Sequence, residues 1–545
     1  MNSSAKATEL LGNLVDVVSG DIRPSRVVVR DGRIAEIAAA DPAQCKHFLV
    51  PGFIDAHVHI ESSMLAPSAF ARAAVCSGVV GSVSDPHEIA NVLGKEGVLW
   101  MVEDGRRTPF KFHFGAPSCV PATPFETAGA SFGPEDVAEL LDCEGVHYLA
   151  EVMNFPAVIH GDERMGRIIA AARARGRRID GHAPGVMGAD LERYAAAGIE
   201  TDHECFTLEQ GRARCQLGMK VAIREGSAAR NFEALWPLLN EFPESCFLCS
   251  DDKHPDDLVE GYLDGILRRA VAHGVPALCA LRAATLNPIR HYGLQAGLLQ
   301  PGDPADIVEI EDLIRFRVRR TWIDGQLVAE NGHTCLPSLT VEPRNRFHAE
   351  PVNVTDLRLS WPDARKPFPV IVAEDGQLVT GREDIPPTCV DGYAVNDPGR
   401  DLLKIVVVNR YNPAPPVIGL IRNFGLRHAA LAGSVAHDSH NIVAVGANDE
   451  ALVRAINAVI ADQGGLSYAD ADTVESIPLP IAGLIALDDA WTVGAAFRRL
   501  TERVRADGCP LQSPYMTLSF MALLVIPRLK IGDRGLFDVD RFSLL

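Results

Sequence analysis

The sequence predicts an α/β protein built around a (β/α)8 barrel of the TIM type, with an open doubly wound sheet as the alternative. Short apolar runs alternate with helix-like segments over residues 51–300, which is the pattern of repeated βα units. Segments rich in β-formers flank this stretch at 10–50 and 305–330. We therefore expect three parts: a small split β-sandwich from residues 1–50 and 301–335, a barrel over 51–300, and an additional C-terminal α/β domain over 340–545.

The flanking β region is predicted from its turn signals. Asp31-Gly32 lies between the β-rich runs 26–30 and 34–37, and Asp-Gly between two such runs is a strong hairpin signal. A similar texture returns at 305–310 and 321–328. Two β-rich pieces on either side of a long insert indicate one small domain assembled from both.

The barrel is predicted from apolar runs that alternate with helical periodicity. The helical segments are 134–141, 163–176 and 256–273, with apolar residues on one face. The apolar runs that we expect to form strands are 49–58, 79–84, 111–114, 147–152, 178–182, 199–203, 219–224 and 245–250.

The C-terminal domain is predicted from a change of texture after the barrel. Segments 357–361, 368–373 and 377–380 have the pattern of a β meander, and 402–408 and 441–446 that of buried strands. A helix is expected to open at Asn448 and to close at Gly464-Gly465.

Length and charge limit the function classes. A chain of 545 residues exceeds one hydrophobic core. Its 52 Lys+Arg against 71 Asp+Glu, a net charge of −19, argue against a nucleic-acid partner. With no signal pattern and no apolar stretch of about 18 residues, we expect a cytoplasmic protein without a membrane partner.

The 12 cysteines are expected to be reduced in that compartment. Cys246 and Cys249 form a CxxC pair inside an apolar run. We interpret them as buried core thiols, with a redox motif as the alternative.

Residues that bind metals lie at the ends of several predicted strands. His57 and His59 point to one face because side chains alternate along a strand. A barrel brings such strand ends together, and imidazole and carboxylate groups suit Zn²⁺, Fe²⁺ or Mn²⁺. Each residue alone has a framework or capping role as its alternative. Together they predict a metal site that activates water, made by His57, His59, Glu151, His182, His203 and Asp251.

Two further polar segments stand out. Asp85, His87 and Glu88 follow the second predicted strand, where Asp85-Pro86-His87 is alternatively only a turn. The run Ala436-His437-Asp438-Ser439-His440-Asn441 lies between apolar strands.

These motifs carry a family resemblance. Pro51-Gly52-Phe53-Ile54-Asp55-Ala56-His57-Val58-His59 resembles the first-strand signature of the amidohydrolase superfamily. Within it the chain resembles the adenine deaminase family, through segments 60–64, 84–92, 150–154, 180–185, 201–204, 250–253 and 433–441.

The resemblance implies hydrolytic deamination of adenine to hypoxanthine and ammonia by a metal-activated hydroxide, in purine salvage. It implies a binuclear divalent metal centre, with Mn²⁺ or Fe²⁺ expected and Zn²⁺ as a further option. Its ligands would be the six residues of the predicted metal site, with Glu151 as the bridge. No lysine stands at the position of Glu151, so a carboxylated-lysine bridge is not expected.

The resemblance also implies catalytic roles. Asp251 would transfer protons from water to the leaving amine, and Glu88 would relay a proton to the purine ring. Asp85 and His87 would support Glu88 or bind an extra metal. The substrate-pocket residues would be His437, Asp438 and His440, with a surface metal cluster or a simple turn as alternatives.

The expected partners are a small-molecule purine substrate and a second copy of the chain, as a homodimer. The alternative functions are another amidohydrolase reaction, such as cyclic-amide hydrolysis, and a non-catalytic barrel used for binding.

Overall fold

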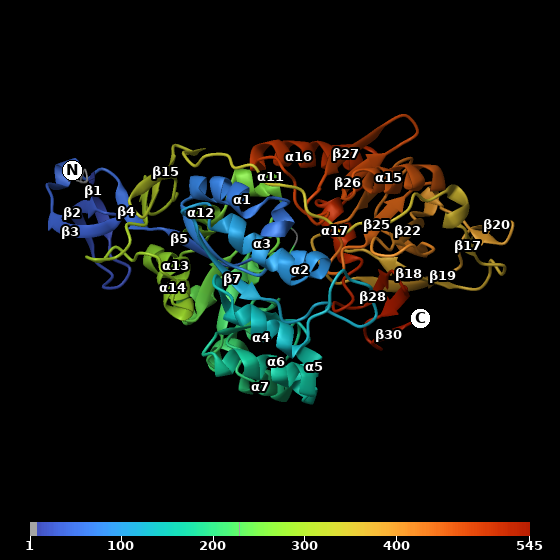
Figure 1. Cartoon of the computed structure of the whole chain (residues 1–545), viewed down its shortest axis with the longest axis horizontal. Coiled ribbons are helices and arrows are strands. Elements are labelled where there is room, and N and C mark those ends of the chain that lie inside the picture. The colour runs from blue at the N-terminus through green and yellow to red at the C-terminus, as the bar shows by residue number, and fades with distance from the viewer. Residues whose placement is uncertain (1–7, 228) are drawn as a thin grey trace.

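The computed structural model describes residues 8–227 and 229–545. The N-terminal strands lie at one end of an elongated molecule, the parallel-stranded part lies in the middle, and the C-terminal part lies at the other end (Figure 1). None of the described helices is long and apolar enough to cross a membrane.

One eight-stranded sheet joins the two β-rich regions that flank the central part. β4 pairs parallel with β1 and antiparallel with β13. The hairpin turn predicted between β2 and β3 is confirmed, with Asp31 and Gly32 at φ 49° and 77°. The sandwich and its boundaries stay predictions. The strands are β1 (Thr8–Val15), β2 (Ile22–Arg30), β3 (Arg33–Ala39), β4 (Phe48–Pro51), β13 (Ile307–Ile310), β14 (Val318–Ile323), β15 (Gln326–Glu330) and β16 (His333–Thr334).

The single strand expected over 49–58 is divided at Gly52, which corrects that prediction. β4 ends at Pro51, and β5 (Phe53–Val58) belongs to a different sheet. A Cβ on Gly52 would lie 2.3 Å from Cγ2 of Val80. Glycine therefore allows the chain to pass between the two sheets at a point where no side chain fits.

The central part is a curled parallel sheet. β5–β9 and β10–β12 each follow in chain order, and their neighbouring strands pair in parallel. Glu200 N donates to Ile179 O at 2.9 Å between the two groups, and Asp251 N donates to His57 O at 2.9 Å. The chain that follows the last strand thus meets the first strand. The remaining strands are β6 (Val79–Ser84), β7 (Lys111–Ala116), β8 (Val146–Val152), β9 (Ile179–Gly181), β10 (Thr201–Asp202), β11 (Lys220–Arg224) and β12 (Cys246–Cys249).

Helices follow these strands, and several begin at a residue whose side chain caps the helix. The Asp162 side chain accepts from Met165 N and caps α6. The helix expected over 256–273 is interrupted at Gly261. The helices are α1 (Pro67–Ala74), α2 (His87–Leu93), α3 (Lys95–Gly105), α4 (Pro134–Asp142), α5 (Phe155–His160), α6 (Glu163–Ala174), α7 (Gly188–Ala196), α8 (Leu208–Gln216), α9 (Phe232–Leu235), α10 (Leu238–Glu241), α11 (Pro255–Glu260), α12 (Leu263–Ala272), α13 (Ala277–Ala283) and α14 (Leu286–Tyr292).

The C-terminal part contains a second eight-stranded sheet, in the order β19-β18-β23-β22-β25-β24-β26-β27. The meander expected over 357–380 is wrong in two respects, because β17 lies in another sheet and 377–380 precedes β19. The strands are β17 (Leu359–Ser360), β18 (Phe368–Val372), β19 (Gly381–Ile385), β20 (Cys389–Val390), β21 (Tyr393–Ala394), β22 (Leu403–Val408), β23 (Val417–Arg422), β24 (Ala430–Gly433), β25 (Ile442–Gly446), β26 (Gly465–Ala469), β27 (Val474–Pro478), β28 (Leu529–Gly532), β29 (Gly535–Asp538) and β30 (Ser543–Leu544). The helices are α15 (Asp449–Ala461), α16 (Ala490–Ala506) and α17 (Pro514–Phe520).

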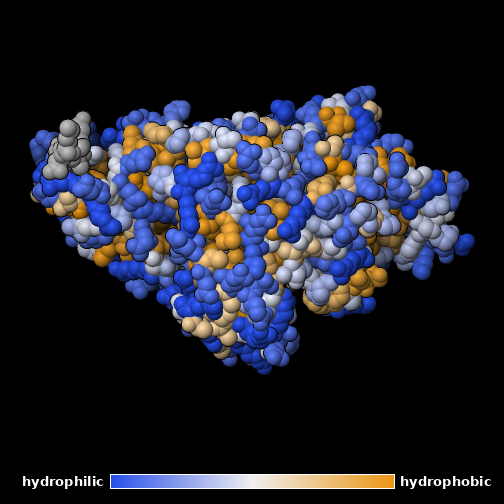
Figure 2. All heavy atoms as spheres, in the orientation of Figure 1, coloured by the Kyte–Doolittle hydropathy of each residue, from blue (hydrophilic) through white to orange (hydrophobic). Residues whose placement is uncertain are grey.

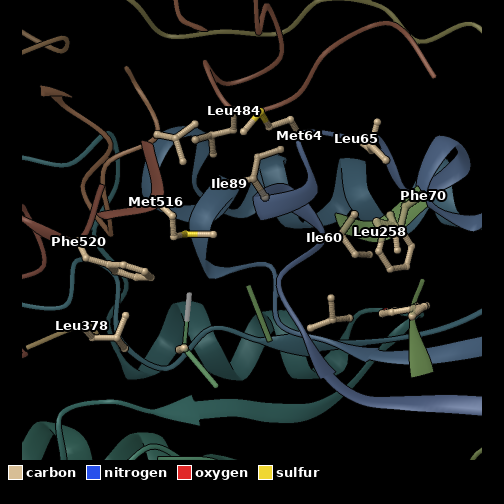
Figure 3. Packing of buried hydrophobic residues seen from close by; sticks show 14 of the residues in the cluster. Ile60, Met64, Leu65, Phe70, Ile89, Leu258, Leu378, Leu484, Met516 and Phe520 are labelled. Carbon is tan, nitrogen blue, oxygen red and sulfur yellow. The ribbon is translucent and has the colours of Figure 1, made fainter. Parts of the chain in front are cut away.

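One hydrophobic core runs from the parallel sheet into the C-terminal part. Figure 3 shows Met64 and Ile89 of the central part packed near Leu484, Met516 and Phe520 of the C-terminal part. Burial of apolar surface therefore holds the central and C-terminal parts against each other.

On the face shown in Figure 2, hydrophobic residues are scattered among hydrophilic ones, which is ordinary for a protein surface.

Candidate functional site

The six predicted metal ligands converge at the carboxyl ends of the parallel strands. His57 lies in β5 with His59 just after it, and Glu151 lies in β8. His182, His203 and Asp251 follow β9, β10 and β12. All six side chains are buried, so the fold brings together groups separated by almost 200 positions in the sequence.

The carboxylates of Glu151 and Asp251 lie among the four imidazoles, and both approach His59. Glu151 Oε2 lies 2.9 Å from His182 Nδ1 and 3.1 Å from His203 Nε2, while Glu151 Oε1 lies 3.5 Å from His59 Nε2. Asp251 Oδ1 lies 3.2 Å from His59 Nε2 and 3.5 Å from His57 Nε2. Glu151 thus contacts both halves of the cluster, as a bridging group would.

The residues present fit a divalent cation. His57 Nε2 and His59 Nε2 lie only 3.2 Å apart, and His57, His59 and Asp251 offer ligand atoms within 4.8 Å of one another. His182 Nε2 is buried without a hydrogen-bond partner. Nitrogen and oxygen donors of this kind suit Zn²⁺, Fe²⁺ or Mn²⁺.

Asp85 accepts hydrogen bonds from the backbone of residues in and beside this cluster. Its Oδ1 accepts from His87 N at 3.1 Å, and its Oδ2 accepts from Glu151 N at 3.2 Å. The Asp85 carbonyl oxygen lies 3.1 Å from His59 Nδ1, which leaves Nε2 of that ring facing the cluster. Asp85 therefore does more than form the local turn, and His87 lies beside it with Nδ1 3.5 Å from Glu151 Oε1.

Glu88 joins the central part to the C-terminal part. It lies in the first turn of α2, and its Oε1 is 2.5 Å from His437 Nδ1. His440 Nε2 contacts Glu88 Oε2. His437, Asp438 and His440 are all buried, so the alternative of a surface metal cluster is wrong.

Glu88 and His437 each favour the charged form of the other, which opposes the effect of burial on their pKa values. Burial raises the pKa of Glu88, but the nearby His437 and His440 imidazoles outweigh it and hold the pKa well below the ordinary value. For His437, burial favours the neutral ring, yet the Glu88 carboxylate raises its pKa to about 9. Glu88 and His437 form a charged, hydrogen-bonded pair beside the metal-ligand cluster, and His440 contacts Glu88.

Sequence reasoning missed Arg224 and Glu204. Arg224, the last residue of β11, donates from Nη1 to Glu204 Oε1 and to Asp251 Oδ2, both at 2.5 Å. Burial raises the pKa of Asp251, but the Arg224 charge and the hydrogen bonds of His57 and His59 hold it well below its ordinary value. The available signals were a charge directly after His203 and another at the end of an apolar run.

The CxxC pair takes no part in the site. Cys246 and Cys249 lie in β12, are fully buried and are free thiols. Burial raises the pKa of the Cys249 thiol well above its ordinary value, which opposes thiolate chemistry. These residues are core thiols, as expected.

Comparison with known proteins assigns the class. The amidohydrolase family model matches residues 48–328, which contain all six predicted ligands. Fold and site together thus define a member of the amidohydrolase family, with a cluster that fits a divalent metal. The adenine deaminase C-terminal domain model matches residues 377–543, which contain His437 and His440.

Similar proteins of known name identify one family within the amidohydrolases. The chain is 53% identical over 541 residues to an adenine deaminase of Salinibacter ruber, covering 98% of each chain. It is 48% identical to one of a Sulfurovum species, covering 98% of this chain and 99% of that one. It is 46% identical to one of Methanosarcina mazei, covering 98% of each. The chain belongs to the adenine deaminase family.

Proposed function

We propose that the chain hydrolyses adenine to hypoxanthine and ammonia. One observation carries this beyond family membership. Glu88, beside the metal-ligand cluster, is hydrogen-bonded to His437, which lies in the region matched by the adenine deaminase C-terminal model. The reacting centre and the family-specific domain therefore share one buried group of residues.

The metal centre would be held by the cluster that includes Glu151 and Asp251. We propose a binuclear site with Glu151 as the bridge, because its two oxygens face His59 on one side and His182 and His203 on the other. A divalent metal there supplies a water that is activated at neutral pH. We propose Mn²⁺ or Fe²⁺ as the physiological ion.

Asp251 and Glu88 would move the protons. The water oxygen attacks C6 of adenine while Asp251, whose Oδ1 faces His57 and His59, accepts a proton from it. Glu88 passes a proton from the protonated His437 ring to the adjacent ring nitrogen, which then holds the π electrons displaced from C6. Asp251 then protonates the exocyclic amine, the bond from C6 to that amine breaks and ammonia leaves. Asp251 accepts the remaining hydroxyl proton as the C6=O bond of hypoxanthine forms, and proton exchange with solvent restores Asp251 and His437.

The C-terminal segment would enclose the purine. His437 Nε2 and Asp438 Oδ2 are buried without hydrogen-bond partners, and buried polar groups of this kind are normally satisfied. A purine offers ring nitrogens and an N–H that complement them. Asp85 and His87 would support Glu88 rather than touch substrate, with Asp85 also fixing the Glu151 backbone.

We further propose the finer architecture and setting. The curled sheet is taken as a TIM-like barrel over 51–300, flanked by a split sandwich from 1–50 and 301–335 and by a domain over 340–545. In support, β4 and β13 pair across the central part, and Asp251 N donates to His57 O. The family resemblance supports a cytoplasmic homodimer in purine salvage.

The test is turnover by purified, Mn²⁺-loaded protein. Loss of adenine absorbance with release of an equal amount of ammonia is expected. The variant H57N should lose turnover and bound metal. His113, which stacks on His147 with ring centroids 4.3 Å apart, provides the matched control H113N, which should retain both. Turnover of a cyclic amide without ammonia release from adenine would overturn the proposal.

A further inference from the structure

The Arg224 guanidinium is hydrogen-bonded to Asp251, the residue proposed to transfer protons. It is only 2% exposed, and its guanidinium takes part in two interactions. Nη1 and Nη2 pair with the two oxygens of Glu204 at 2.5 and 2.9 Å, and Nη1 also donates to Asp251 Oδ2 at 2.5 Å. One planar fork therefore fixes two carboxylates, which a lysine ammonium cannot reproduce.

The two oxygens of Asp251 have separate partners. Oδ2 accepts from Arg224, while Oδ1 faces His57 and His59. The backbone of Asp251 has φ 60°, a left-handed conformation that is uncommon for a residue other than glycine. Such a conformation persists when surrounding contacts determine it. One of these contacts is the hydrogen bond from Arg224 to the Asp251 side chain.

Glu204 is the second carboxylate that Arg224 restrains. Glu204 Oε1 lies 3.5 Å from both His182 Nδ1 and His203 Nε2, the same two rings that Glu151 contacts. Arg224 places a positive charge beside Glu204 and holds both of its oxygens on the guanidinium. Glu151 Oε2 lies closer to the same two rings, at 2.9 and 3.1 Å.

We propose that Arg224 is a positioning residue, which aims Asp251 Oδ1 at the metal-ligand cluster and fixes both oxygens of Glu204 beside it. The proposal rests on the proposed function for its effect on turnover, but its effect on metal binding is independent of the substrate. Loss of a group that orients metal ligands typically costs about 10–100-fold in metal affinity or activity.

Metal binding is the first test, with Mn²⁺ alone as the probe. Calorimetric titration of metal-free R224M is expected to give an affinity for Mn²⁺ about 10–100-fold weaker than that of the unmodified protein. R224K should recover only part of the loss. The control R178M removes an exposed arginine paired with Glu200 and should keep the affinity. If R224M does not fold, R224M/E204Q removes the cation together with one of its anions.

Turnover is the second test. R224M should lower kcat about 10–100-fold and change KM for adenine less than about threefold. Because Arg224 acts through Asp251, adding R224M to D251N should cause little further loss. Unchanged Mn²⁺ affinity in R224M and R224M/E204Q, or losses in R224M and D251N that multiply, would overturn the proposal. Failure of the unmodified protein to deaminate adenine would overturn the proposed function alone.

Discussion

We expect Lys530 to make the stability of the C-terminal part depend on pH. Its side chain is fully buried in β28 and donates to the carbonyl oxygens of Leu378 and Phe520 at 2.7 and 2.9 Å. Burial lowers its pKa from the ordinary 10.5 to about 7. Between these values the unfolded chain holds a proton that the folded chain releases, so folding becomes more favourable as the pH rises.

The size of the effect follows from that shift. Each pH unit within the window contributes about 1.4 kcal/mol to the free energy of unfolding. For a unit of 150–250 residues, 1 kcal/mol shifts Tm by about 2–4 °C. Between pH 7.5 and 9.5, the Tm of the unmodified protein should therefore rise by about 5–10 °C relative to that of K530M, which lacks the titrating group.

Differential scanning calorimetry of both proteins at pH 7.5, 8.5 and 9.5 measures this difference directly. The exposed lysine of the same region, Lys366, provides the control K366M, whose Tm should stay parallel to that of the unmodified protein. A Tm difference between the unmodified protein and K530M that does not change with pH would refute the reasoning.

Three further outcomes are expected. E88Q should lower kcat about 10²–10⁴-fold with little change in KM, because an amide cannot give up the proton that the ring needs; steady-state kinetics that match the unmodified enzyme would contradict this. Chelation should abolish turnover and lower Tm, and Mn²⁺ at about 100 times its Kd should restore both, through about 2.7 kcal/mol of binding energy; a Tm insensitive to Mn²⁺ would count against the metal site. A thiol reagent should label the exposed Cys335 in the native protein and reach the buried Cys246 and Cys249 only after unfolding, as mass spectrometry of the labelled peptides would reveal.

Much of the central part was predictable because local signals agree there. Parallel strands buried on both faces produce apolar runs, and the residues after them carry the chemistry. All six predicted metal ligands, His203 included, could be assembled from these two rules. The pairings among them could not, because a distance such as 2.9 Å between Glu151 and His182 depends on the curl of the whole sheet.

Other features depend on contacts between distant segments. Gly52 divides a run whose pattern predicts a single strand, because Val80 occupies the adjacent space. The contact of Glu88 with His437 joins residues 349 positions apart, so no periodicity signals it. Arg224 looks like an ordinary strand-end charge until Glu204 and Asp251 are placed around it.

Burial of the candidate site has a kinetic consequence. Glu88, Asp251 and His437 are each no more than 3% exposed, so we expect adenine to reach them only after part of the chain moves aside. Each catalytic cycle then includes an opening step that involves none of the chemical groups, and this step sets an upper limit on turnover. Added viscosogen should slow such an enzyme even when its chemistry is unchanged. Substitutions at apolar residues that take no part in the chemistry, such as Ile89 and Met516, would alter the rate by changing how often the site opens.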